Sequence, residues 1–379
     1  MSVAVRMEDL LGRAPIAIDS APVRRELSDK IVLVTGAAGS IGSELCRQIR
    51  MQHPAALVGV DRSETGIFHL QSELQKNPAA PGNPCPVAYL VADIGDVERM
   101  RAIFRRHRPD VVFHTAAHKH VPLMERNAGE AVCNNVFSLL SLLQVAEEYS
   151  CRGFALISSD KAVNPASVMG ATKRLGEMIL AGRQRGSLRC ISVRFGNVLG
   201  SSGSVVPILE EQLHSGQALT ITHPEVRRFL MTPQEAVAMV LLSYTLGCHG
   251  EILALDMGEP VSILDLARKL IRLHGRSERE TPIEFTGLRE GEKLCEKISS
   301  EREELLPTAH PKIKRIRSAP VAWKVLADQI ERLRASVFSG DDAEIRARLR
   351  EIVPQYQTPD SKRPASLPDE PVRTTSSAD

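Results

Sequence analysis

Short runs of apolar and β-branched residues alternate along the chain with longer segments of helical periodicity. The apolar runs occupy 31–35, 56–60, 87–91, 110–115, 154–158 and 188–195, and the helical segments lie at about 41–52, 63–75, 96–107, 129–149 and 168–185. Strands that are apolar on both faces and alternate with helices are typical of a parallel sheet covered on both sides. The pattern therefore predicts an α/β fold with a doubly wound parallel sheet, which binds ligands at its carboxyl edge.

The alternation loosens after Phe195. Gly, Pro and Ser cluster at 196–207 and later elements are shorter, which predicts a smaller lobe at 196–318 that closes over the sheet edge and is partly interleaved with the sheet. We expect an N-terminal arm at 1–28 with a short amphipathic piece, and two terminal helices within 319–354. Residues 355–379 are rich in Pro, Ser, Thr, Asp and Lys, which predicts a disordered tail.

Composition excludes several classes of protein. The chain has 379 residues and a formal net charge of +2, which gives no electrostatic reason to expect nucleic acid as a partner. The longest apolar run, at about 236–248, is too short to span a bilayer, and the N-terminus has no signal core. Seven cysteines without a C-x-x-C pair fit a reducing cytosol. We expect a soluble, cytoplasmic protein without a transmembrane segment.

The first chemical signal is the segment IVLVTGAAGSIG at 31–42, in which Gly36, Gly39 and Gly42 follow a strand and open a helix. Such glycines permit a tight turn and let backbone amides approach a pyrophosphate at the helix N-terminus. A glycine triplet alone is often only structural. The order of strand, turn and helix, together with an acid downstream, favours a dinucleotide-binding domain at 29–195.

That acid is Asp61, which ends the second strand, 25 positions after Gly36. A carboxylate there binds the ribose hydroxyls of NAD and repels the 2′-phosphate of NADP, whereas Arg62 would act in the opposite direction. Asp93, at the end of the third strand, is either a partner of the adenine amino group or the N-cap of the next helix. The sequence leaves this choice open.

Further motifs make the assignment more specific. They are VFHTAAHKHVPLME at 112–125, SSDKAVNPASVMGATK at 158–173, RFGNVLGSSGSV at 194–205, HPEVRRFLMT at 223–232 and GLREGEKL at 287–294. The G-x-x-G-x-x-G spacing resembles the short-chain dehydrogenase superfamily. The whole set, from about residue 8 to residue 298, resembles the UDP-N-acetylglucosamine 4,6-dehydratases of capsule and O-antigen biosynthesis. The resemblance implies an extended short-chain dehydrogenase with a Rossmann domain and a smaller C-terminal substrate-binding lobe.

The resemblance implies NAD as the cofactor, with NADP as the alternative, and a UDP-amino sugar as the substrate. The cofactor-binding residues that it and the motifs imply are Gly36, Gly39, Ser40, Ile41, Gly42, Asp61, Arg62, Ser63, Asp93, Ile94, Ala116, Ala117, Lys119, Asn135 and Lys173. The implied substrate-binding residues are His120, Asn197, Arg228, Arg289 and Glu292. Arginines suit a diphosphate because their paired donors match its oxygens. Arg227 is an alternative to its neighbour Arg228.

By the same resemblance, the catalytic residues are Ser159, Asp160, Lys161, Met169 and Lys173. Asp160 would be the acid at the C6 hydroxyl and Lys161 the base at C5, which requires a raised pKa for Asp160 and a lowered one for Lys161. Met169 stands where the wider superfamily has the tyrosine of Tyr-x-x-x-Lys, as in one branch of the dehydratases. This leaves Ser159, a water or Asp160 to take the C4 hydroxyl proton.

Three histidines lie close together in the sequence: His114, His118 and His120. Their spacing matches no strong zinc signature, so we expect no metal site.

Two other functions remain open. A UDP-sugar 4-epimerase would share the fold and cofactor but normally needs the missing tyrosine, and a non-catalytic NAD-binding regulatory protein would need neither Asp160 nor Lys161. The resemblance also implies retention at C5, a homo-oligomer, and a form that lacks the membrane domain of many relatives.

Overall fold

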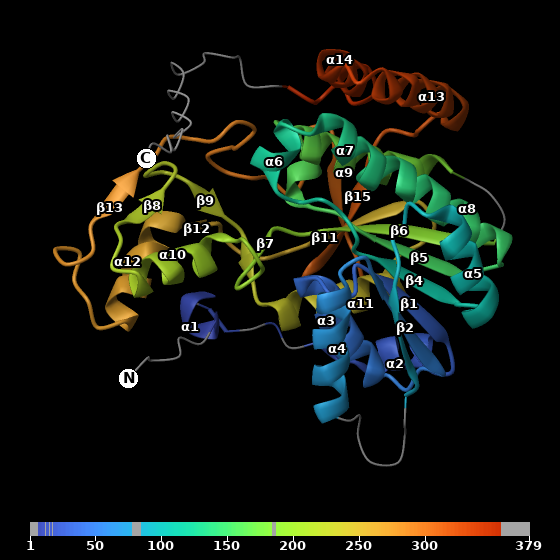
Figure 1. The fold of residues 1–379 in the computed structure, drawn as a ribbon, viewed down its shortest axis with the longest axis horizontal. Helices are drawn as coiled ribbons and strands as arrows, with labels where there is room; N and C mark the ends of the chain where they lie inside the picture. Colours follow the sequence, from blue (N-terminus) through green and yellow to red (C-terminus); the bar gives the residue numbers. More distant parts are fainter. Residues whose placement is uncertain are drawn as a thin grey trace, which may run out of the picture.

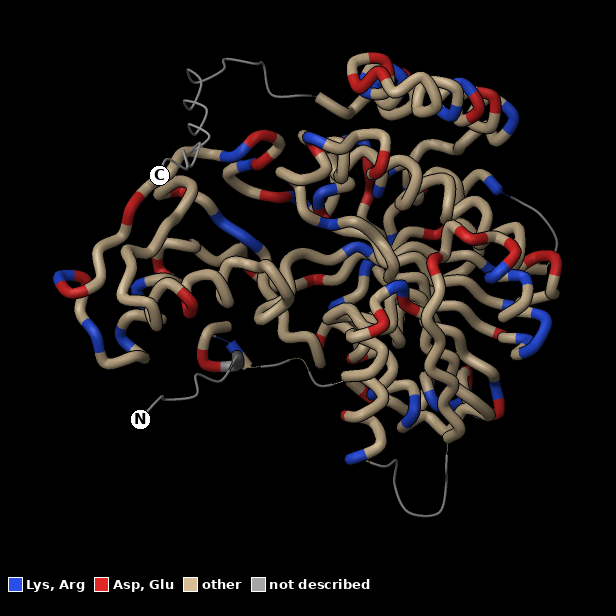
Figure 2. The backbone as a smooth tube through the Cα atoms, viewed as in Figure 1, with Lys and Arg blue, Asp and Glu red and all other residues tan. Residues whose placement is uncertain are grey.

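The structure is a computed structural model that describes residues 7–11, 13–14, 16, 18–77, 85–183 and 187–357, without the side chains of residues 7 and 8. A large sheet with helices on both faces makes up most of it, and a smaller lobe lies beside the sheet, on the left in Figure 1. Lys and Arg positions are interspersed with Asp and Glu positions over both parts (Figure 2).

Within the described residues, the large sheet has nine strands in the order β14-β15-β11-β6-β5-β4-β1-β2-β3. Their bounds are β1 Ile31–Thr35, β2 Ala56–Asp61, β3 Val87–Val91, β4 Val111–His114, β5 Gly153–Ile157, β6 Arg189–Arg194, β11 Glu251–Leu255, β14 Glu304–Pro307 and β15 Ile313–Arg317. Neighbouring strands from β3 to β11 are parallel, and β15 and β14 are antiparallel. The predicted doubly wound sheet is confirmed, and its six predicted strands agree to within one residue at each end.

Helices cover both faces because successive strand residues point to opposite sides. Leu33 belongs to one apolar cluster, whereas Val32 and Val34 belong to another. The first face is covered by α5 Val97–His107, α7 Ala128–Val132, α8 Ser138–Glu148 and α9 Val168–Gly182, and the second by α2 Ala21–Leu27, α3 Ser40–Arg50, α4 Glu64–Lys76 and α11 Pro233–Leu246. Helices α13 Trp323–Ser339 and α14 Asp342–Ile352 pack outside α7 and α9 (Figure 1).

The smaller lobe has an apolar cluster of its own. Its helices are α1 Met7–Leu11, α10 Val205–His214 and α12 Ile263–Leu273. Three short strand pairs accompany them: β8 Leu219–Ile221 and β13 Ile283–Phe285, β9 Arg227–Arg228 and β12 Val261–Ser262, and β7 Asn197–Val198 and β10 Leu230–Met231. Four elements from the range 196–318 belong to the large domain instead: β11, β14 and β15 are strands of the large sheet, and α11 packs against it. The chain therefore crosses between the two parts several times.

Several local predictions differ from the structure. The N-terminal arm contains α2, which sequence analysis missed, and the predicted helix at 129–149 is interrupted by a π-helical turn at Cys133–Phe137. The start of the predicted tail is held to the fold, since Tyr356 is 2% exposed and the Gln357 amide donates to the Pro165 carbonyl. The rest of the predicted tail, 358–379, and residues 184–185 of the predicted helix 168–185 lie outside the described residues.

Two global features can be reported for the described part of the chain. All seven cysteines are free. No helix among the described residues combines the length and the apolar character needed to cross a bilayer.

A buried ion network joins three elements of the large domain. The guanidinium of Arg194, at the end of β6, is fully buried and makes two hydrogen bonds of 2.7 Å to Glu177 of α9 and two of 2.9 Å to Glu303, just before β14. Ser158, after β5, donates to Glu177 at 2.6 Å. Each buried charge is thus neutralised by a partner with good geometry, as burial of ions requires.

Glu177→Ala should lower the free energy of unfolding by about 3–5 kcal/mol, because it removes one of the two carboxylates that neutralise the buried Arg194 guanidinium and leaves Glu303 to compensate both Arg194 and Arg174. Chemical denaturation measures this. Glu301→Ala, which removes only the exposed partner of Lys297, should leave the denaturation midpoint almost unchanged. Equal small effects of both substitutions would show that the network does not stabilise the fold.

Candidate active site

The glycine turn between β1 and α3 is fixed by close backbone contacts. Gly36 has φ +66°, and a Cβ there would lie 2.6 Å from the Ala116 amide nitrogen. A Cβ on Gly42 would lie 2.0 Å from the Gly36 carbonyl oxygen. Only glycine fits at these positions, and the turn presents the N-terminal amides of an 11-residue helix to the space above the sheet.

Asp61 holds this turn against the end of β2. Its Oδ2 accepts from the Ala38 amide at 3.0 Å, and its Oδ1 accepts from the Ser63 amide at 2.9 Å. Asp61 and Arg62 line the cleft above the sheet. Ser63, predicted as a cofactor contact, does not line it, and its hydroxyl accepts from the Gly66 amide as the N-cap of α4.

The structure separates the two interpretations of Asp93. Asp96, not Asp93, is the N-cap of α5, since its side chain accepts from the Arg99 amide. Asp93 accepts from the Gly95 amide at 2.7 Å and lines the cleft together with Ile94. Asp93 is therefore placed where it can meet a ligand rather than where it caps a helix.

Asn135 positions a loop and does not line the cleft. Its side-chain amide pairs with both backbone groups of His118, at 2.8 and 3.0 Å, and donates to the Thr172 hydroxyl at 3.0 Å. The π-helical turn widens the helix here, and Asn134 lines the cleft instead. Asn135, predicted as a cofactor contact, thus secures the loop between β4 and α6 Val121–Glu125 to α9.

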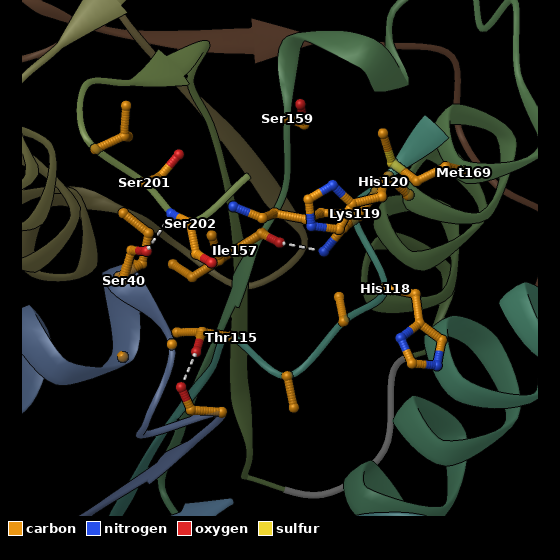
Figure 3. A pocket seen from close by; sticks show the side chains of 18 of the residues that line it. Ser40, Thr115, His118, Lys119, His120, Ile157, Ser159, Met169, Ser201 and Ser202 are labelled. Atoms are coloured by element: carbon orange, nitrogen blue, oxygen red, sulfur yellow. Dashed lines mark hydrogen bonds between the residues drawn. The ribbon is translucent and has the colours of Figure 1, made fainter. Parts of the chain in front are cut away.

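The cleft has a volume of about 550 Å³ and lies above the carboxyl edge of the sheet (Figure 3). Apart from Ser63 and Asn135, every predicted cofactor residue lines it. It is closed on one side by the loop at 199–204, where the Ser202 amide donates to the Ser40 hydroxyl at 3.2 Å. Gly203 is needed in this loop, since it has φ +67° and a Cβ would lie 2.5 Å from His120.

A second pocket of about 220 Å³ adjoins the cleft and extends into the smaller lobe. All five predicted substrate residues line it: His120, Asn197, Arg228, Arg289 and Glu292. Arg228 and Glu292 form an ion pair of 2.6 Å, and Thr222 donates to the same carboxylate at 3.0 Å. Of the two neighbouring arginines, Arg228 is the one that lines this pocket, whereas Arg227 is exposed on β9.

The two pockets meet at Lys161, which lines both. Its Nζ donates to Asp160 Oδ1 and to Asn197 Oδ1, each at 3.0 Å. Burial acts to lower the pKa of Lys161, but the negative charges of Asp160 and Glu296 outweigh it and raise the pKa above its usual value. The expectation of a lowered pKa is therefore wrong for the free protein, because the neighbouring carboxylates stabilise the ammonium form.

Asp160 lies behind the cleft rather than on its surface. Its side chain is fully buried, its Oδ1 also accepts from the Ser159 hydroxyl at 2.9 Å, and its Oδ2 has no hydrogen-bond partner. Ser159 lines the cleft (Figure 3). A ligand hydroxyl in the cleft would therefore meet Ser159 and reach Asp160 through it.

Met169 and Lys173 lie on the same face of α9 and both line the cleft. The Lys173 ammonium donates to the Ile157 carbonyl at 2.9 Å. Burial lowers the pKa of Lys173 to about 8, although the charge of Glu177 acts in the opposite direction. The lowered lysine pKa that sequence analysis assigned to Lys161 thus belongs to Lys173.

The three histidines have separate environments. His114 is buried, bonds Thr35 through Nδ1 at 2.8 Å, and has its pKa lowered to about 3 by burial and by the charge of Lys173. His118 pairs with Glu130 at 2.9 Å, and His120 lines both pockets. No group of three or more metal-ligating side chains is found in the part of the chain that the structure describes.

Sequence analysis missed two residues at this junction, Lys293 and Glu296. Glu296 is 4% exposed and lines the second pocket, 3.8 Å from Lys161. Lys293 lies within the GLREGEKL motif and pairs with Glu296 at 2.9 Å. One signal could have identified them. Lys293 belongs to the motif that already supplies Glu292, and Glu296 follows three positions after this lysine.

The parallel sheet, the glycine turn after β1 and the acid at the end of β2 define an α/β protein of the short-chain dehydrogenase fold. A family model described as polysaccharide biosynthesis protein matches residues 32–318. The chain belongs to the polysaccharide biosynthesis protein family.

Three relatives illustrate this membership. The capsular polysaccharide biosynthesis protein CapD of Staphylococcus aureus is 45% identical over 79% of this chain and 50% of its own length. The probable polysaccharide biosynthesis protein EpsC of Bacillus subtilis is 43% identical over 91% of this chain and 57% of its own. A UDP-glucose 4-epimerase of Rickettsia massiliae is 33% identical over 73% of this chain and 79% of its own length. The chain spans about half the length of CapD and EpsC.

Solved structures agree with the fold. Pen from Bacillus thuringiensis aligns with a TM-score of 0.69 and 31% identity over 78% of this chain and 91% of its own. The dTDP-glucose 4,6-dehydratase DesIV of Streptomyces venezuelae, with NAD bound, aligns with a TM-score of 0.63 and 21% identity. The alignment covers 71% of this chain and 88% of DesIV. The UDP-glucose 4-epimerase of Thermotoga maritima, with UDP-glucose, aligns with a TM-score of 0.61 and 24% identity. The alignment covers 71% of this chain and 89% of the epimerase. The last two establish the fold alone.

The position of Asp61 leads to a prediction about cofactor choice. Asp61→Ser should lower NAD affinity by about 10- to 100-fold, because it removes a charged acceptor for the ribose hydroxyls. The ratio of NADP to NAD affinity should rise, since Arg62 remains. Calorimetric titration with each dinucleotide measures both. Glu64→Ser, at an exposed position next to the same turn, is the control, and an unchanged affinity ratio in Asp61→Ser would contradict the prediction.

Proposed function

We propose that this chain is an NAD(P)-dependent UDP-N-acetylglucosamine 4,6-dehydratase that forms a UDP-4-keto-6-deoxy amino sugar, with retention at C5, for a surface polysaccharide such as capsule or lipopolysaccharide. The observation that carries the proposal is the position of Lys161, paired with Asp160, at the junction of the two pockets. Membership of the polysaccharide biosynthesis family and the dehydratase and epimerase structures of the same fold support it.

The residues of the cleft fit a dinucleotide. The glycine turn leaves no room for side chains, the amides of α3 point toward the site of a pyrophosphate, and Asp61 lies at the end of the next strand. A bound nicotinamide would accept the hydride of C4 and return it to C6. Lys173 would bind the nicotinamide ribose, and the second pocket would hold the UDP portion through Arg228, Arg289 and Glu292.

Proton transfer in this site would follow from the pairing of Asp160 with Lys161. The C4 hydroxyl proton passes through Ser159 to Asp160 along the 2.9 Å hydrogen bond. This removes the negative charge that raises the pKa of Lys161, so that the amine can release its proton to solvent and take the one on C5. Protonated Asp160 then returns its proton through Ser159 to the hydroxyl that leaves C6 as water. When the hydride has returned to C6, the Lys161 ammonium, after exchange with solvent, protonates C5, and the amine regains its own proton from solvent.

The alternative function is a UDP-sugar 4-epimerase. The 33% identity to the Rickettsia epimerase favours it. Met169 opposes it, because its thioether lines the cleft at the position of the usual tyrosine and cannot exchange a proton. A dehydratase with Ser159, Asp160 and Lys161 does not need that tyrosine.

Incubation with UDP-N-acetylglucosamine in deuterated water, followed by NMR and mass spectrometry, tests the proposal. We expect loss of water and one solvent deuteron at C5. Lys161→Met and Asp160→Asn should each slow turnover by about 100- to 10,000-fold, because each removes a proton-transfer group. Lys297→Met, at an exposed position, should not.

Other outcomes would replace the proposal. A C4 epimer without loss of water would establish the epimerase. An unchanged sugar with dinucleotide demonstrably bound, on this and other UDP-sugars, would favour a non-catalytic NAD-binding protein.

The lowered pKa of Lys173 predicts a pH dependence. Its ammonium favours hydride acceptance, and the charge is lost as the pH rises through about 8. We expect kcat to fall above that pH, and Lys173→Met to have a lower kcat at pH 7 without this alkaline limb. Turnover from pH 6 to pH 10 measures it, with Lys297→Met as the control. An alkaline limb that persists in Lys173→Met would assign it to another group.

A further inference from the structure

The ammonium of Lys161 has two hydrogen-bond acceptors and one further carboxylate at ion-pair distance around it. Asp160 Oδ1 and Asn197 Oδ1 each lie 3.0 Å from Nζ, and Glu296 Oε1 lies 3.8 Å away. The first two belong to segments directly after β5 and β6. The third comes from the segment that follows the GLREGEKL motif of the smaller lobe.

Glu296 is itself held by Lys293. Its Oε2 accepts from the Lys293 ammonium at 2.9 Å, and the same ammonium donates to the Val163 carbonyl at 2.9 Å. Val163 directly follows the 3-10 turn Asp160–Ala162, which carries the catalytic pair. The segment from the smaller lobe is thus attached to the catalytic turn at two points, the Lys161 side chain and the Val163 backbone.

Asp160, Lys161, Glu296 and Lys293 form a line of four charges of alternating sign. Both acids are buried, at 0% and 4% exposure, and both lysines are mostly covered, with side chains 22% and 21% exposed. Such an arrangement is stable only when each charge has a partner. A glutamate needed only to secure the lobe could pair with Lys293 alone, but Glu296 also faces Lys161 across the second pocket.

We propose that Glu296 and Lys293 are positioning residues for Lys161: Glu296 holds the Lys161 amine at the junction of the two pockets, and Lys293 fixes Glu296 and offsets part of its charge. The role assigned to Lys161 rests on the proposed dehydratase function, whereas the placement of its amine does not. The catalytic amine is thereby coupled to the segment that also supplies Arg289 and Glu292 to the second pocket.

The charged groups that face Lys161 determine the sign of each substitution. Asp160 and Glu296 raise its pKa, and Arg228 on β9 lowers it. Lys119, on the loop after β4, also repels it, and His120 on that loop lines the same junction. Removing the Glu296 charge should therefore lower the pKa of Lys161. Removing the Lys293 charge should raise it, because Glu296 then acts without compensation.

Glu296→Gln and Lys293→Met test this in the full-length protein without any substrate. Competitive acetylation of Lys161 with trace acetic anhydride across a pH series, read by mass spectrometry, follows its titration. We expect the midpoint to move by about one pH unit in opposite directions, downward in Glu296→Gln and upward in Lys293→Met. The double variant should return close to the unmodified protein, and Lys297→Met should show no shift.

A merely structural role predicts something else, namely that both variants lose stability while the Lys161 midpoint stays the same or moves in one common direction. Either result would overturn the proposal. If one variant misfolds, an unchanged midpoint or a shift of the opposite sign in the other still overturns the proposal.

Activity gives a second, separable measurement. If the unmodified protein dehydrates UDP-N-acetylglucosamine, the acid limb of C5 deuterium exchange should move with the acetylation midpoint, while KM changes little. If it does not dehydrate the sugar but the opposite shifts are found, the proposed function fails and the positioning role stands. Dehydration without opposite shifts overturns only the positioning role.

Discussion

The buried guanidinium of Arg194 determines how the elements around the site lie relative to one another. It links Glu177 on α9 to Glu303 ahead of β14, and an unpaired charge at this depth would cost several kcal/mol. Helix α9 carries Met169 and Lys173, and β6 continues from Arg194 into Asn197. One ion network therefore links the two elements that carry the residues on either side of the junction between the pockets.

Around that junction, similar side chains have different proton affinities because their neighbours differ. Burial lowers the pKa of Lys119, His120 and Lys173, with further repulsion from nearby cations at the first two. Lys161 is the exception, because two carboxylates compensate its burial. The partly buried ammonium groups of Lys119 and Lys173 would attract an anionic ligand such as a diphosphate. The pKa of Lys161, in contrast, would fall if one of its two carboxylate neighbours lost its charge.

The sequence was sufficient for features that depend on local pattern. Strand and helix positions follow from periodicity, and the glycine turn follows from its spacing. Features that depend on contacts between distant segments were beyond it: the burial of Asp160 behind Ser159, the pairing of Asn135 with the His118 backbone, and the approach of Glu296 to Lys161. The expected direction of the Lys161 pKa was wrong because the neighbouring Asp160 and the distant Glu296 together outweigh the effect of burial, and the approach of Glu296 cannot be anticipated from the sequence around residue 161.

The segment at 287–296 shows how binding and chemistry can depend on the same few residues. Glu292 pairs with Arg228 in the second pocket, and four positions later Glu296 faces Lys161. Directly before Glu292, Gly291 has φ +74° and lies so close to the start of α9 that a Cβ would be 2.8 Å from Ser167. The same short segment therefore lines the second pocket and supplies a carboxylate beside the Lys161 amine.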